Sequence, residues 1–103
     1  RVLNRHMVSL GSADSALVHP REVFRPAILD GASMIVAVHN HTSGDPTPSS
    51  EDVRITKKLV EAGKIIGIPL IDHVIVGRGT APGRSHTSLR ESGLCDFNVG
   101  GEQ

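Results

Sequence analysis

The clearest sign of the architecture is the segment Met34-Ile35-Val36-Ala37-Val38-His39-Asn40-His41. Its first five residues form a continuous apolar run, and their length and β-branched content predict a strand buried on both faces. Residues 39–48 are polar and rich in turn formers, so we expect them to form a loop and not to continue the strand. This reading places two histidines at the carboxyl end of a central strand.

Upstream of this strand the sequence predicts a strand and a helix. Residues 2–10 are compatible with an edge or second strand, which Gly11 and Ser12 end. Pro20 suits the first turn of a helix, and Gly31 suits the position after its end. Pro26 lies inside that helix, where we expect it to kink the helix or shorten its first half.

Downstream, apolar residues at helical spacing predict a helix that begins at Ser49 to Asp52 and ends at Gly67. Residues 68–76 read as a second apolar strand and residues 78–87 as a loop. Residues 88–93 suggest a short helical turn, and residues 96–103 a loosely ordered tail.

The order strand, helix, strand, helix, strand predicts an α/β domain with a layered mixed sheet and flanking helices. The two apolar strands, joined by a helical crossover, should lie parallel as neighbours or near neighbours. At 103 residues the chain suits a single small domain, which we place at residues 1–95, and excludes two.

The amino-acid composition limits which partners and which cellular compartment we expect. Eleven basic and eleven acidic residues cancel, so no overall field attracts nucleic acid or an anionic membrane. The single cysteine, Cys95, excludes an internal disulfide and a multi-cysteine zinc site, which favours a reducing cytoplasm. Residues 1–10 lack the apolar core of a signal peptide, and no apolar run reaches the ~20 residues of a membrane helix. We therefore expect a cytoplasmic protein without a membrane partner.

Three residues have the types and spacing of a metal site. His39 and His41 are two apart, so in an extended chain their side chains project to the same side. The ten residues between His41 and Asp52 are enough to bring the start of the next helix back to the strand end. Two imidazole nitrogens and one carboxylate suit zinc better than Mg²⁺ or Ca²⁺, with iron and manganese left open. Three protein ligands leave a fourth position for water, whose pKa zinc lowers toward ~7.

Ser49, three residues before Asp52, has two readings that can coexist. Its hydroxyl can cap the helix, with Asp52 as the acidic partner of a capping box. The same hydroxyl can donate a hydrogen bond to an oxyanion forming on a bound substrate. Without their surroundings, His39 and His41 would favour the simpler interpretation of two polar loop residues.

The wider pattern His39-x-His41, seven residues, Ser49-x-x-Asp52 resembles the JAMM motif of the MPN metalloprotease family. Further segments make the chain resemble the bacterial RadC proteins, over residues 2–77 and more weakly over 88–93. These segments are Val18-His19-Pro20-Arg21-Glu22-Val23-Phe24, Thr42-Ser43-Gly44-Asp45-Pro46-Thr47-Pro48, Leu59-Val60-Glu61-Ala62-Gly63 and Gly67-Ile68-Pro69-Leu70-Ile71-Asp72-His73-Val74-Ile75-Val76-Gly77.

The resemblance implies an MPN-type, deaminase-like fold that binds one zinc ion per chain through His39, His41 and Asp52, with Ser49 assisting. It also implies hydrolysis of a peptide or isopeptide bond, in which metal-bound water attacks the carbonyl. Such enzymes need a glutamate as general acid/base on a strand well before the histidines, and we expect this chain to lack that first strand. Glu22, in the predicted helix, reads instead as a solvated or paired residue.

A second hypothesis is a non-catalytic zinc-binding interaction module, associated with DNA repair or processing. The cations of the second helix alternate with acidic residues, which is typical of a solvated helix face and gives nucleic-acid binding little support. His73 reads as a core histidine with a hydrogen bond or as a residue that supports the metal ligands. His6, His19 and His86 lack metal-like spacing.

Overall fold

The computed structural model describes residues 4–11, 14–77 and 86–97. The elements in chain order are β1 (Arg5–Gly11), the 3-10 helix η1 (Ser15–Leu17), α1 (Pro20–Leu29), β2 (Met34–Asn40), α2 (Ser50–Ile66), β3 (Leu70–Val76) and β4 (His86–Ser88). Among these described residues, no helix is long and apolar enough to cross a membrane.

The four strands form one mixed sheet in the order β1-β2-β3-β4. β1 pairs with β2 and β2 with β3 in parallel, whereas β3 and β4 are antiparallel. The predicted α/β class and the parallel pairing of the two apolar strands are confirmed.

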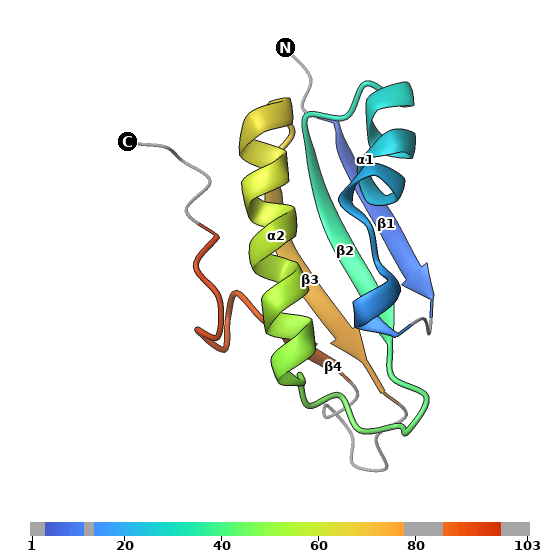
Figure 1. Cartoon of the computed structure of the whole chain (residues 1–103), viewed down its shortest axis with the longest axis vertical. Helices are drawn as coiled ribbons and strands as arrows, with labels where there is room; N and C mark the ends of the chain where they lie inside the picture. The colour runs from blue at the N-terminus through green and yellow to red at the C-terminus, as the bar shows by residue number, and fades with distance from the viewer. Residues whose placement is uncertain (1–3, 12–13, 78–85, 98–103) are drawn as a thin grey trace.

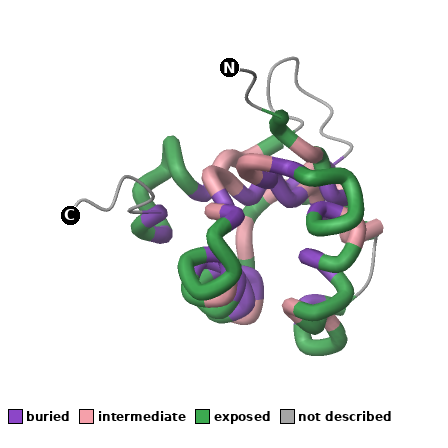
Figure 2. The backbone as a smooth tube through the Cα atoms, turned by 90° about the horizontal axis from the view of Figure 1, so that it is seen from above, coloured by how far each residue is buried: buried purple, intermediate pink, exposed green. Residues whose placement is uncertain are grey.

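Both long helices cover the same face of the sheet, as Figures 1 and 2 show. This arrangement follows from topology: both crossovers step along the sheet in the same direction, so right-handed connections place both helices on one side. The carboxyl ends of β1 and β2 therefore meet the start of α2 and the segment that carries η1.

The hydrophobic core lies between this sheet face and the helices. Ile35 and Ala37 of β2 and Leu70 and Ile75 of β3 are buried there. The side chain at position 39 continues the same alternating series, which turns it toward α2.

Several predicted boundaries are wrong. β2 continues through His39 and Asn40, because both pair with β3 opposite Ile75 and Val76, so the loop begins later than expected. β3 begins at Leu70 and not at residue 68. β4 takes the end of the predicted 78–87 loop, and residues 78–85 of that loop lie outside the described residues.

The C-terminal predictions fare differently. Residues 89–93 form turns after β4, and the Ser92 N–H donates to the Ser88 carbonyl at 3.0 Å, so the predicted single helical turn is present although it is not a helix. Cys95 and Phe97 are buried in the core, so the described part of the predicted tail packs against the domain. Residues 98–103 of that tail lie outside the described part.

Candidate metal centre

The three predicted ligands come together where β2 ends and α2 begins. His39, near the end of β2, is almost fully buried. The backbone N–H of His41, just past the strand, donates to the carbonyl of Val76 at 2.9 Å, so the chain stays attached to β3 there. Asp52, on the first turn of α2, is also buried.

The start of α2 forms the predicted capping box. The Ser49 hydroxyl accepts a hydrogen bond from the Asp52 N–H at 3.1 Å. Oδ2 of Asp52 accepts one from the Ser49 N–H at 2.8 Å. This reciprocal pair satisfies two backbone donors at the helix start and fixes the carboxylate beside the strand end.

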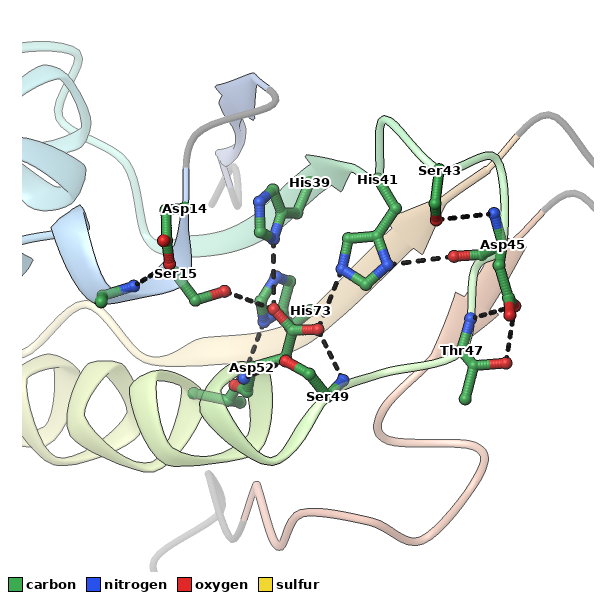
Figure 3. Close-up of polar contacts among 12 residues, drawn as sticks. Asp14, Ser15, His39, His41, Ser43, Asp45, Thr47, Ser49, Asp52 and His73 are labelled. Atoms are coloured by element: carbon green, nitrogen blue, oxygen red, sulfur yellow. Dashed lines mark hydrogen bonds and ion pairs between the residues drawn. The ribbon is translucent and has the colours of Figure 1, made fainter.

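Each oxygen of Asp52 lies near one imidazole (Figure 3). Nε2 of His41 is 2.9 Å from Oδ2, and Nδ1 of His39 is 3.5 Å from Oδ1. One donor atom from each of the three residues lies within 4.8 Å of the others. Zinc binds nitrogen and oxygen at about 2.0–2.2 Å, and these donor atoms are close enough together to share one ion. The group could therefore hold a metal ion, and its donors fit zinc.

The loop after β2 orients His41. Nδ1 of His41 lies 3.0 Å from the carbonyl oxygen of Asp45. A carbonyl only accepts, so Nδ1 carries the proton and Nε2 faces Asp52. The Asp45 carboxylate accepts from the backbone and hydroxyl of Thr47 at 3.0 and 2.7 Å. These two hydrogen bonds lower the pKa of Asp45 below its usual value.

Ser15 is a site residue that the sequence reading missed. Its buried hydroxyl donates to Oδ1 of Asp52. Burial raises the pKa of Asp52, but the hydrogen bonds from Ser15 and Ser49 outweigh that effect and hold the pKa below its ordinary value. The carboxylate is thus kept ionised, as a metal ligand must be.

His73 and Thr56 lie next to this group. Thr56 Oγ1 is 2.6 Å from both the carbonyl oxygen of Asp52 and Nδ1 of His73. The predicted hydrogen bond of a core histidine is therefore present. Burial lowers the pKa of His73 to about 4, with a smaller contribution from His39, so its ring is neutral at pH 7.

A cavity of about 370 Å³ opens beside the three ligands. Ser49 lines it, and among the described residues no acceptor receives its hydroxyl proton. Asp14 and Glu51 also line it, but Asp14 accepts from the Ala16 N–H and Glu51 pairs with Arg54.

The remaining predicted charges lie elsewhere. Glu22 is exposed on α1 and lies 3.5 Å from Arg21, as expected of a solvated or paired residue. His6 pairs with Asp30 at 2.6 Å, and Lys64 of α2 pairs with Glu61. Among the described residues, His39, His41 and Asp52 are the group of three that could hold a metal ion.

Comparison with known proteins identifies the family of this chain. Residues 1–94 match the family described as RadC-like JAB domain. A UPF0758 protein of Caldanaerobacter subterraneus is 53% identical over 97 residues, which are 94% of this chain and 40% of that protein. A UPF0758 protein of Methanosarcina acetivorans is 46% identical over 94 residues, covering 91% of this chain and 39% of the relative.

This chain thus spans about 40% of the length of the relatives it matches. The four-stranded mixed sheet with its two covering helices is consistent with a JAB/MPN-type fold. The chain belongs to the RadC-like JAB domain family.

Proposed function

We propose that this chain is the metal-binding part of a zinc-dependent hydrolase of metallopeptidase type, acting on a peptide or isopeptide bond. The observation that supports this most is the convergence of His39, His41 and Asp52 beside an open cavity. Two of the three donors are imidazole nitrogens, which favours zinc over the hard cations Mg²⁺ and Ca²⁺.

The chain's own residues supply the arrangement. His39, His41 and Asp52 would hold the ion, which when bound polarises a carbonyl and lowers the pKa of water. The carbonyl of Asp45 orients the His41 ring, and the capping box orients Asp52. The hydroxyl proton of Ser49 is available to donate to an oxygen that gains negative charge in the cavity.

Proton transfer needs a further carboxylate. The two described acidic residues that line the cavity besides Asp52, Asp14 and Glu51, already have partners. The glutamate that the resemblance implies should therefore be sought in a full-length protein that contains this domain, and activity should be assayed there.

The first test is metal content, measured by elemental mass spectrometry on protein purified without added metal or chelator. We expect about one zinc per chain in the wild type and loss of it in His41→Ala and Asp52→Ala. His19→Ala is the matched control, because His19 is exposed and its side chain makes no capping hydrogen bond. A wild type that stays free of metal after zinc is supplied would sink the proposal.

The second test is turnover of peptide and isopeptide substrates by the full-length protein. Cleavage that His41→Ala abolishes, with the fold retained by circular dichroism, would support the hydrolase. Stoichiometric zinc without turnover would instead favour the interaction module, and a steep salt dependence of DNA affinity would favour its nucleic-acid form.

A further inference from the structure

Two buried polar residues that are not predicted ligands, Thr56 and His73, connect Asp52 on α2 with His39 on β2. Thr56 lies one helical turn after Asp52 on α2, and His73 lies on β3 opposite Ala37 of β2. Both side chains are fully buried. We propose that His73 and Thr56 are positioning residues of the metal centre, which hold His39 and Asp52 in register with each other. This inference rests on the proposed metal site.

The direction of the hydrogen bonds follows from the atoms involved. The Asp52 carbonyl can only accept, so the single hydroxyl proton of Thr56 points to it across 2.6 Å. Nδ1 of His73, also 2.6 Å from that hydroxyl oxygen, must then be the donor. The hydrogen bonds therefore run from Nδ1 of His73 through the Thr56 hydroxyl to the main-chain carbonyl of Asp52, and this direction fixes the tautomer of His73.

His73 reaches the other ligand, His39, through a contact between the two rings. The His73 and His39 rings are stacked, with centroids 5.9 Å apart and planes 20° from parallel. The His41 ring also lies next to the His39 ring, with centroids 5.3 Å apart and planes 83° apart in an edge-to-face arrangement. The His73 and His39 rings are drawn next to each other in Figure 3. One side chain thus restricts the ring plane of one ligand and the helix turn of another.

Core packing alone does not explain a histidine here. Nε2 of His73 is buried and has no hydrogen-bond partner among the described residues. A buried polar atom without a partner costs free energy that an apolar ring of similar shape avoids. A role in orienting the ligands accounts for the presence of the imidazole.

Two substitutions separate the two contacts of His73. His73→Phe keeps a ring against His39 and removes the donor to Thr56. His73→Asn keeps an N–H near the position of Nδ1 and removes the ring. Thr56→Val removes the relay with little change of volume, and Thr56→Ser restores its hydroxyl. Ile35→Ala is the control for lost stability, because Ile35 is buried at the start of β2, away from the ligands.

The readouts are the zinc dissociation constant, from competition with a chromophoric chelator, and the visible absorption spectrum of the Co²⁺-loaded protein. We expect Thr56→Val and both His73 variants to bind zinc about 10- to 100-fold more weakly, the range typical of lost outer contacts to metal ligands. We also expect altered Co²⁺ spectra. Thr56→Ser should restore both properties. Ile35→Ala should change neither the zinc dissociation constant nor the Co²⁺ spectrum.

Failure of this inference can be told from failure of the proposed metal site. If wild type binds one zinc and all His73 and Thr56 variants match it in affinity and spectrum, His73 and Thr56 are only core residues. If wild type binds no metal, the proposed function fails, and nitrogen NMR of the metal-free protein still tests the network. The network requires the proton of neutral His73 on Nδ1, and a proton on Nε2 alone overturns it.

Discussion

Oδ2 of Asp52 lies 2.9 Å from Nε2 of His41, across the loop that joins β2 to α2. The other oxygen, Oδ1, accepts from Ser15 and faces His39. A single carboxylate therefore joins the strand that carries the histidines, the helix that begins at Ser50 and the segment between β1 and α1. The geometry of the candidate metal-binding group depends on how each of these contacts holds Asp52.

The contact with Ser15 should strengthen metal binding. In Ser15→Ala, Oδ1 loses its hydrogen-bond donor and the carboxylate can rotate away from His39. We expect the zinc dissociation constant to rise about tenfold, as for other outer contacts to metal ligands, in a competition titration. Ser9→Ala, an exposed serine on β1, is the matched control. Equal affinities of Ser15→Ala and wild type would show that the capping box alone orients Asp52.

The metal-free protein should lose stability in mild acid because of His73. Its pKa is about 4 in the folded protein and ordinarily 6.5, so between these values the unfolded chain binds more protons. The contribution of His73 to the free energy of unfolding is therefore fully present above pH 6.5 and is lost as the pH drops toward 4. The free energy of unfolding should decrease by about 3 kcal/mol over this window, measured by urea denaturation with a chelator present. In His73→Phe that part of the slope should disappear, and an unchanged slope would contradict the assignment.

Most of the candidate site could be predicted from residues close together in sequence. The rest depends on contacts between residues far apart in sequence. The apolar run of β2 and the Ser49–Asp52 capping box are readable because each depends on residues close together in sequence. Ser15 is 37 positions from Asp52, and nothing in its neighbourhood marks it as a partner. Thr56 offered a signal, because it is a polar residue at a position on the apolar face of α2.

The strand boundaries failed for a related reason. His39 and Asn40 are turn-compatible by residue type. Pairing with β3 makes both of them strand, and His39 also pairs with Gly11 of β1. β4 has three residues and exists through its antiparallel pairing with β3. Phe97 lies in the predicted loosely ordered tail, yet its side chain is buried in the core. Strand pairing and burial of this kind depend on partner residues that lie far away in sequence, so they cannot be predicted from the neighbouring residues alone.

Cys95 should react slowly with alkylating agents in the folded protein. Burial raises the pKa of its thiol, and nearby Lys57 opposes this only in part. Because the thiolate is the reactive form, iodoacetamide at pH 8 should label native protein far more slowly than protein in guanidinium chloride, measured by intact mass. A chain with Cys95→Ser and Glu91→Cys provides an exposed comparison and should label rapidly when native. Equal native rates would mean that the segment after β4 does not stay packed.

Gly77 should matter to metal binding although it lies outside the ligand set. A Cβ at this position would lie 2.7 Å from the carbonyl carbon of Gly44 and 2.9 Å from the nitrogen of Pro46, closer than such atoms approach. Gly77→Ala must therefore displace the loop on either side of Asp45, whose carbonyl orients the His41 ring. We expect weaker zinc binding together with a loss of about 1–3 kcal/mol in stability, as for overpacked sites.

A matched comparison separates the loop from general destabilisation. Gly63→Ala also meets backbone, with Ile68 O at 2.7 Å, but at the far end of α2 from Asp52. Both variants should unfold more easily, and only Gly77→Ala should lose zinc affinity and alter the Co²⁺ spectrum. If Gly63→Ala weakens zinc binding equally, the affinity follows overall stability and the Gly77 contact has no specific part in orienting His41. If Gly77→Ala alone does so, the end of β3 sets the position of the loop and, through Asp45, the ring that faces Asp52.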